Sequence, residues 1–256
     1  MSGAHRPRMV RAFSRAEGYD ASAIVQREVA GSLAAQIAGI ALSEHPRILE
    51  IGCGTGFLTQ ALAEKGIAGD WLVTDISPAM VRRSRARMAR YPQVRFAVLD
   101  GEHETPEAAG SYDLVCSSLA LQWFDDPLGA AARMLGWLAP GGNLLFTTLA
   151  AGTFAEWRAA HEAEGLVAGL RVFPQADAWA HVAREAQAGP PRIDRLAEQH
   201  ADAMAFLRSL KAIGAATPQP GHAPLAPAAL RRVMRRFERE STAVSYEVVT
   251  CHYRRP

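Results

Sequence analysis

The stretch Arg47-Ile-Leu-Glu-Ile-Gly-Cys-Gly-Thr-Gly56 decides the fold of this chain. Its first half, residues 48–51, is an almost uninterrupted apolar run, which is typical of a buried parallel strand. Glycines then occupy every second position of residues 52–56, and apolar residues recur at helical spacing through residues 57–63. This order of strand, glycine turn and helix predicts a backbone that turns tightly and lets a ligand lie almost against the main chain.

The spacing of these glycines indicates the kind of ligand. Dinucleotide-binding turns have the pattern Gly-x-Gly-x-x-Gly, which seats a pyrophosphate on a helix N-terminus. Here Glu50 stands before glycines at positions 52, 54 and 56, and an acid beside the turn suits a cationic ligand better than a pyrophosphate. The pattern resembles the first motif of the class I S-adenosylmethionine (SAM) methyltransferases. A generic nucleotide-binding turn is the alternative.

Polar residues stand at the ends of four predicted strands. The strands are residues 48–51, 71–75, 94–100 and 112–118, and the polar residues are Glu50, Asp75, Asp100 and the pair Ser117–Ser118. Strands that alternate with helices predict a Rossmann-like α/β fold with a mostly parallel sheet. Ligands in such sheets bind outside the carboxyl ends of the strands, so we expect the four residues to share one nucleoside site.

The pattern changes near residue 150. Before it, we expect a helix over residues 127–138, ended by Pro140-Gly141-Gly142, and a fifth strand over residues 143–149. After it, we expect helices at 156–164, 204–213 and 228–239, and strands at 193–200 and 244–251. We expect one domain over residues 1–256, with a core at about 20–150 and with insertions in 151–256 that form a lid over the ligand edge.

The composition is that of an ordinary globular protein, with 49% hydrophobic and 21% charged residues. A net charge of +2 gives no reason to expect a nucleic-acid partner. The three cysteines are widely scattered, which predicts neither a metal site nor a disulfide framework and favours a reducing compartment. No apolar run reaches the length of a membrane span, so we expect a cytoplasmic protein that binds no membrane.

Several segments together resemble the malonyl-[acyl-carrier protein] O-methyltransferases of biotin synthesis, the BioC family. They are Phe13-Ser-Arg-Ala, Tyr19-Asp, Val25-Gln-Arg-Glu, Ser117-Ser-Leu-Ala-Leu-Gln-Trp123, Leu145-Phe-Thr-Thr-Leu, Gly152-Thr-Phe-x-Glu156 and Leu207-Arg-Ser-Leu-Lys-x-Ile-Gly214. The last segment is the most specific, because it lies in the substrate-side insertions. The resemblance implies a seven-stranded, mostly parallel sheet with an antiparallel last strand.

The resemblance also implies a reaction. SAM methylates the free carboxylate of malonyl-acyl-carrier protein, or of malonyl-CoA, and the ester serves as the primer for pimeloyl and biotin synthesis. A carboxylate is already ionised at pH 7 and a sulfonium is already activated, so we expect neither a general base nor a metal. Catalysis is then mostly positioning in a dry pocket.

The motif match implies the following cofactor contacts. Gly52 and Gly54 approach the methionine part of SAM, Glu50 orders the turn or binds the ammonium group, and Ser117 lies beside the sulfonium.

The match also implies contacts at the nucleoside end. Asp75 accepts hydrogen bonds from the ribose hydroxyls, and Ile76 packs on adenine. Asp100 accepts from the adenine amino group, with Gly101 adjacent. Tyr19 and Gln26 belong to an N-terminal helix that closes over SAM, and Tyr19 is our candidate catalytic residue.

The substrate side needs a cation for the malonyl carboxylate. Arg208 and Lys211 are the candidates, because positions three apart share a helix face and arginine offers a bidentate fork. Trp123 is the candidate for lining the pantetheine channel. Acyl-carrier proteins are acidic as a family, so a basic helix stripe is expected to dock the carrier. Its members are Arg231, Arg232, Arg235, Arg236 and Arg239.

Three alternatives stay open. The first is another SAM methyltransferase, acting on a different small acid or on a quinol. The second is a respiratory-complex assembly factor with this fold, a group that shares the Leu-x-Trp stretch but is not expected to need the 208–214 segment. The third is a pseudoenzyme with SAM as a structural ligand, against which Glu50, Asp75 and Asp100 argue.

Overall fold

The computed structural model describes residues 11, 19–183, 186–215, 218–219 and 221–256. These residues form two compact units. The larger unit contains Ile24–Thr148, Gln175–Ile193 and Val249–Pro256, and the smaller unit contains Leu149–Pro174, Asp194–Val248 and the described residues up to Ala23. The Phe13-Ser-Arg-Ala segment of the family resemblance lies outside the described residues.

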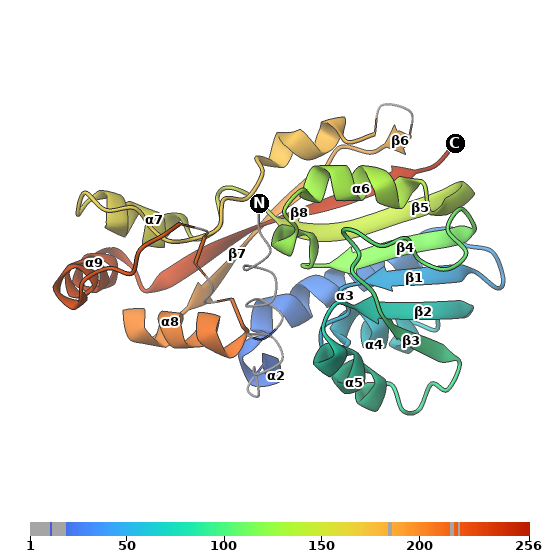
Figure 1. Cartoon of the computed structure of the whole chain (residues 1–256), viewed down its shortest axis with the longest axis horizontal. Coiled ribbons are helices and arrows are strands. Elements are labelled where there is room, and N and C mark those ends of the chain that lie inside the picture. The colour runs from blue at the N-terminus through green and yellow to red at the C-terminus, as the bar shows by residue number, and fades with distance from the viewer. Residues whose placement is uncertain (1–10, 12–18, 184–185, 216–217, 220) are drawn as a thin grey trace. The chain divides into compact units, whose positions relative to one another are not determined.

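The strands form one sheet in the order β3-β2-β1-β4-β5-β8, with β6 and β7 both paired to β8. Their bounds are β1 (Arg47–Ile51), β2 (Asp70–Asp75), β3 (Val94–Val98), β4 (Tyr112–Ser118), β5 (Leu138–Leu149), β6 (Gln187–Ala188), β7 (Arg192–Gln199) and β8 (Ala243–Arg254). β1 to β5 pair in parallel and lie side by side in Figure 1. With the two-residue β6 set aside, this confirms the predicted seven-stranded sheet with an antiparallel last strand.

The core of the larger unit lies between its central strands and two helices. Every residue of β1 after Arg47 is buried, as a parallel strand covered on both faces requires. α3 (Ile24–Ala38) and α4 (Phe57–Glu64) pack on each other and share one apolar cluster with β1, β2 and β4. Leu33 and Leu62 are completely buried in that cluster, so the two elements that flank the glycine turn, β1 and α4, are anchored in one core.

The region between β4 and β5 corrects one expectation. η1 (Leu121–Trp123) is followed by α6 (Pro127–Leu135), which ends three residues earlier than predicted. β5 begins at Leu138, so Pro140-Gly141-Gly142 lies inside a strand and does not end the helix. The physical reason is pairing with β4, because Leu138 pairs with Tyr112 and a register shift absorbs the irregular segment before Asn143. α5 (Pro78–Arg87) begins as predicted, with the Ser77 hydroxyl accepting from a backbone N–H.

Aromatic side chains form the core of the smaller unit. Its helices are α2 (Tyr19–Ser22), α7 (Ala155–Glu162), α8 (Ala203–Ala212) and α9 (Pro227–Glu240). The Trp157 ring lies 5.4 Å from Phe206 of α8 and 5.3 Å from Phe237 of α9, centroid to centroid. Edge-to-face pairs of this kind stabilise by about 0.5–1.5 kcal/mol beyond burial. η2 (Ala176–His181) belongs to the larger unit.

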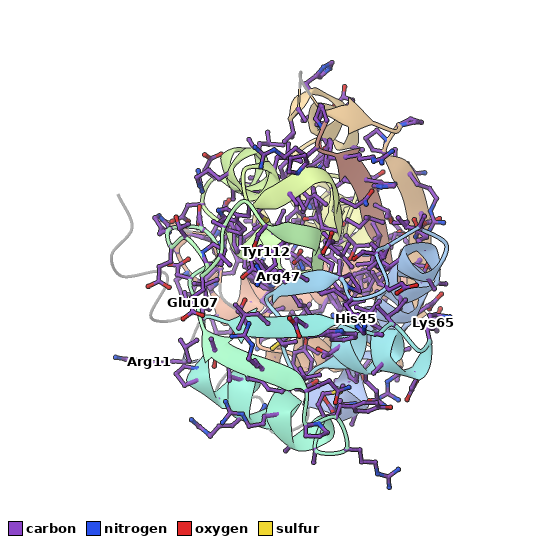
Figure 2. All side chains as sticks on the ribbon, turned by 90° about the vertical axis from the view of Figure 1, so that its right-hand side faces the viewer. Arg11, His45, Arg47, Lys65, Glu107 and Tyr112 are labelled. Carbon is purple, nitrogen blue, oxygen red and sulfur yellow. The ribbon has the colours of Figure 1, made fainter. Side chains whose placement is uncertain are left out.

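Where β1 and β4 begin, polar groups form hydrogen bonds between the two strands. The Arg47 backbone N–H donates to Asp113 Oδ2 at 2.8 Å, and its Nη1 donates to Ser111 Oγ at 3.0 Å. Figure 2 shows Arg47 beside Tyr112 at this edge, and the Tyr112 hydroxyl donates to the Glu107 carbonyl at 2.5 Å. The polar residues of the predicted site stand at the other ends of these strands.

The described residues contain three free cysteines, Cys53, Cys116 and Cys251, and all three are buried. None of the helices that the structure describes is both long and apolar enough to cross a membrane. Within the same part of the chain, no group of three His, Cys, Asp or Glu residues is arranged to hold a metal ion.

Candidate cofactor site

The glycine turn after β1 has a backbone that only glycine adopts easily. Gly52, Gly54 and Gly56 have φ angles of 70°, 54° and 93°, in the left-handed region. A Cβ on Gly52 would lie 2.3 Å from the Ala120 Cβ, and one on Gly56 would lie 2.6 Å from the Ser84 Oγ. The turn is therefore packed against the segment after β4 and against α5, which leaves its backbone close to the carboxyl ends of the strands.

Asp75, at the end of β2, is bound to this turn. Its Oδ2 accepts from the Gly54 N–H at 2.9 Å and its Oδ1 accepts from the Ser77 N–H at 2.8 Å. Burial raises the pKa of Asp75 although these two hydrogen bonds oppose the shift. A carboxylate has about four acceptor sites, so Asp75 retains capacity for the two ribose hydroxyls that the sequence assigned to it.

Glu50 is the second buried carboxylate of the site, with 1% of its surface exposed. Its Oε2 accepts from the Thr59 hydroxyl of α4 at 2.7 Å. Burial, with a smaller contribution from the charge of Asp75, raises the pKa of Glu50 to about 7, although the Thr59 hydrogen bond lowers it. The side chain is directed to α4, and its predicted contact with the turn or with the SAM ammonium stays a prediction.

These two acids provide the test of whether the site fits SAM. Among the residues that the structure describes, neither Glu50 nor Asp75 is paired with Lys, Arg or His. Two buried acids without a cation are costly and are relieved by a positively charged ligand. SAM carries an ammonium and a sulfonium and has no phosphate, so the donor set fits SAM and disfavours a pyrophosphate.

Ser117 joins two strands at the same edge. Its hydroxyl is fully buried and donates to the Ile51 carbonyl at 2.8 Å, directly before Gly52. The hydroxyl therefore fixes the start of the glycine turn against β4. Its predicted place beside the sulfonium stays a prediction.

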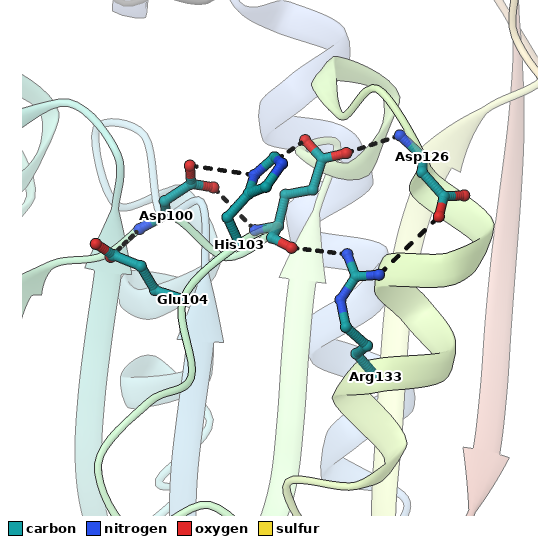
Figure 3. Close-up of polar contacts among 6 residues, drawn as sticks. Asp100, His103, Glu104, Asp126 and Arg133 are labelled. Atoms are coloured by element: carbon teal, nitrogen blue, oxygen red, sulfur yellow. Dashed lines mark hydrogen bonds and ion pairs between the residues drawn. The ribbon is translucent and has the colours of Figure 1, made fainter.

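Asp100 lies in the loop after β3, two residues beyond the end of the strand, so the predicted strand 94–100 is too long. Its Oδ1 accepts from the Glu102 N–H at 3.0 Å, and its Oδ2 lies 3.4 Å from His103 Nδ1 (Figure 3). A Cβ on Gly101 would lie 2.4 Å from Ile51 Cγ2. Glycine at this position therefore brings the Asp100 loop against the end of β1, where the adenine end of the ligand is expected.

Glu102 is a site residue that the sequence did not reveal. Its side chain is 2% exposed, and its Oε1 accepts from the Asp126 N–H at 2.7 Å. Its carbonyl accepts from Arg133 Nη2, in the last turn of α6, at 2.7 Å, so Glu102 ties the Asp100 loop to both ends of α6. A Gly-Glu-His-Glu loop has no periodicity and resembles a solvated charge run, so no sequence pattern indicates this burial.

The other predicted cofactor and channel residues of the larger unit are half-buried. Ile76 lies between Asp75 and the cap of α5, Gln26 lies in α3, and Trp123 ends η1. Their ligand contacts stay predictions.

Tyr19, Arg208 and Lys211 belong to the smaller unit. Tyr19 is half-buried in α2, which packs on α8. Gln26 lies in the separate helix α3, so the single N-terminal helix predicted for both residues is wrong. Arg208 and Lys211 are exposed on α8, whose buried residues are Ala203, Phe206 and Leu210. Arg208 Nη2 lies 3.8 Å from Asp202 Oδ1. The two cations share an exposed face, and their contact with substrate stays a prediction.

The chain resembles known methyltransferases in fold. The family profile described as a methyltransferase domain matches residues 48–142. A putative methyltransferase from Bacillus halodurans superimposes with a TM-score of 0.63 at 14% identity, covering 88% of this chain and 98% of that one. A phosphoethanolamine N-methyltransferase of Haemonchus contortus, solved with S-adenosylhomocysteine, gives a TM-score of 0.55 at 16% identity. The match covers 88% of this chain and 52% of that one.

Relatives identify the family more narrowly. The chain is 43% identical to the biotin biosynthesis bifunctional protein BioCD of Bordetella avium over 94% of its own length, and it spans half of that protein. It is 36% identical to a malonyl-[acyl-carrier protein] O-methyltransferase of Magnetococcus marinus, covering 99% of this chain and 94% of the relative. A Gallionella capsiferriformans protein of the same name is 32% identical, with 97% and 90% coverage. The chain therefore belongs to the malonyl-[acyl-carrier protein] O-methyltransferase family of class I SAM-dependent methyltransferases.

Proposed function

We propose that this enzyme methylates the free carboxylate of a malonyl thioester on acyl-carrier protein, for biotin synthesis. The observation that carries the proposal is the match to a relative of that name over nearly the whole length of both chains. The two buried carboxylates beside the glycine turn support it, because no Lys, Arg or His among the described residues pairs with them and they suit a cationic methyl donor.

The larger unit supplies the cofactor residues. SAM, when bound, supplies an electrophilic methyl group on a positively charged sulfur. Asp75 is proposed to bind the ribose hydroxyls with its remaining acceptor sites while it holds Gly54 in place. Glu50 is proposed to balance the positive charge of the methionine end, and Asp100 to bind the adenine amino group. These residues bind and orient, and none of them needs to transfer a proton.

The smaller unit is proposed to supply the substrate residues. Arg208 is held by Asp202 at 3.8 Å, and both side chains are more than half exposed. Exposed ion pairs stabilise by only about 0–1 kcal/mol, so a malonyl carboxylate can replace Asp202 at little cost. Lys211 on the same exposed face adds a second positive charge, and Tyr19 of α2 is proposed to order the reacting groups.

We also propose that the two units act as a single methyltransferase domain. The larger unit contains every predicted cofactor-binding residue, and the smaller unit contains the catalytic candidate Tyr19 and the candidate cations for the substrate. Neither set is sufficient for methyl transfer alone.

The experiment is mass spectrometry of malonyl-carrier protein incubated with the enzyme and SAM. The expected product carries one added methyl group, and fragmentation of the released acyl-pantetheine arm should place that group on the malonyl carboxylate. Acetyl-carrier protein, which has no free carboxylate, is the matched control and should stay unmodified. Methylation of both carriers, or of neither, would refute the proposal.

A further inference from the structure

The positive charges of α9 divide into two groups. The helix contains five arginines, and they are Arg231, Arg232, Arg235, Arg236 and Arg239. Arg232 Nε lies 3.0 Å from Glu164 Oε2, and Arg236 Nε lies 3.0 Å from Glu240 Oε1. These two are therefore neutralised within the smaller unit, although the sequence alone grouped them with the others.

Arg231, Arg235 and Arg239 form the second group, which we name the arginine stripe. All three are exposed, and no carboxylate among the described residues pairs with them. They are four residues apart, so they lie on one helix face over about 12 Å. Neither acid of the helix balances them, because Glu238 accepts from the Ala203 N–H of α8 at 3.0 Å and Glu240 is paired with Arg236.

The arginine stripe does not help the fold. Like charges at i and i+4 destabilise a helix by about 0.2–0.5 kcal/mol per pair. α9 is held instead by its opposite face, where Val233 and Phe237 are buried and Phe237 stacks on Phe206 of α8 at 6.0 Å. Three uncompensated charges on a rigidly anchored helix are an arrangement suited to an acidic partner.

We propose that the arginine stripe is the docking surface for the acidic carrier protein that presents the malonyl thioester. This rests on the proposed function. The stripe lies in the same unit as Arg208 and Lys211. Within that unit α8 and α9 pack together, and the rings of Phe206 and Phe237 stack between them. A carrier bound to α9 is thus anchored to the unit that holds the candidate cations for its acyl group.

The test compares two substrates and two matched double variants. Arg231→Glu/Arg235→Glu reverses two charges of the stripe. Arg82→Glu/Arg90→Glu makes the same charge change at two exposed positions of the larger unit. Each enzyme is assayed with malonyl-carrier protein and with malonyl-pantetheine, which has the acyl arm without the protein.

The stripe variant should lose about tenfold or more in kcat/KM for the carrier, because like-charge contacts replace complementary ones. Its kcat/KM for malonyl-pantetheine should stay within about twofold, and the Arg82/Arg90 control should change neither value by more than about twofold. Arg231→Gln/Arg235→Gln should lose less than the charge reversal. An equal loss on both substrates, or the same carrier loss in the control, would overturn the proposal.

A binding measurement separates this proposal from the proposed function. Fluorescence anisotropy of labelled carrier protein without an acyl group measures docking without chemistry. Weaker binding by the Arg231→Glu/Arg235→Glu variant alone supports docking even if no methylation is seen. Equal binding by the wild type, this variant and the Arg82/Arg90 control overturns docking even if methylation proceeds.

Discussion

Asp75 accepts the Gly54 N–H at 2.9 Å across a turn in which all three glycines have positive φ. The acid proposed to bind the ribose thus also holds the conformation of the loop proposed to approach the methionine end. With these assignments one carboxylate couples the two halves of the cofactor site, so a substitution at Asp75 should affect both.

Replacing Asp75 with Asn should weaken SAM binding about tenfold or more. An Asn offers one carbonyl oxygen, so its NH2 group must face either the Gly54 or the Ser77 N–H, and an unmade buried hydrogen bond costs about 1–3 kcal/mol. Isothermal titration calorimetry measures the Kd. Asp70→Asn, an exposed position on the same strand, is the control, and equal affinities of the two variants would contradict the coupling.

Replacing Glu50 with Gln should stabilise the protein at pH 8 and have little effect at pH 5. The pKa of Glu50 is raised from 4.5 to about 7 by burial, so the folded state prefers the protonated form. Stability from this group is present below pH 4.5 and is lost as the pH rises through 7, by about 3 kcal/mol in full. Gln still accepts from Thr59. Denaturant unfolding at both pH values measures the difference, and parallel pH profiles would exclude this role for Glu50.

SAM binding near pH 7 should release protons. A cation close to Glu50 favours its ionised form and lowers its pKa from about 7, so affinity should rise from pH 6 to pH 8. Calorimetry in two buffers of different ionisation enthalpy gives the number of protons released. Glu50→Gln should release fewer protons than the wild type on binding SAM. An unchanged number would mean that the protons come from a group other than Glu50.

Glu102→Ala should raise the KM for SAM about tenfold and leave kcat within about twofold. The substitution leaves the Asp126 N–H without its acceptor, so that the loop loses its hydrogen bond to the start of α6 and keeps the bond from Arg133 to the backbone carbonyl of residue 102. Glu102→Gln retains an acceptor oxygen and should restore most of the KM. Glu107→Ala, whose side chain is 85% exposed, is the control. A loss confined to kcat would mean that Glu102 acts on the reacting groups rather than on positioning.

Arg208→Ala should raise the KM for malonyl thioester with little change in the KM for SAM. Asp202→Asn should lower the KM for malonyl thioester by about twofold, because it removes the charge that pairs with Arg208. Asn remains a good N-cap for α8, so the helix should be kept. Steady-state kinetics measures both KM values. Arg195→Ala, at another exposed arginine of the smaller unit, should change neither KM. An equal rise in the KM for malonyl thioester in Arg195→Ala would mean that Arg208 does not bind the substrate.

The elements that the sequence predicted well are those with strong local patterns. Strand 112–118 has the predicted bounds because it is an apolar run between turn residues, and α5 begins where Ser77 and Pro78 mark a helix start. The end of α6 was wrong because Pro140-Gly141-Gly142 is a local signal for a helix end, whereas pairing of Leu138 with Tyr112 is a tertiary contact.

In the candidate site, too, the residues with a local sequence signal were predicted and those that depend on tertiary contacts were not. Glu50, Asp75 and Ser117 lie where strand ends place them, since parallel strands bring their carboxyl ends to one edge. Glu102 was missed because its burial depends on Asp126 and Arg133, which are 24 and 31 residues away. Arg232 and Arg236 differ from the arginine stripe only through their partners Glu164 and Glu240, and Glu164 lies in a distant segment.

The three buried thiols have a practical consequence for following the protein in solution. Cys53, Cys116 and Cys251 all lie in the larger unit, and burial raises the pKa of each, to about 12 for Cys251. An alkylating reagent should therefore not label the native enzyme and should modify it only when that unit opens. Because the chain has no other cysteine, the rate of labelling is a reporter of unfolding in the cofactor-binding half alone, and SAM should slow it.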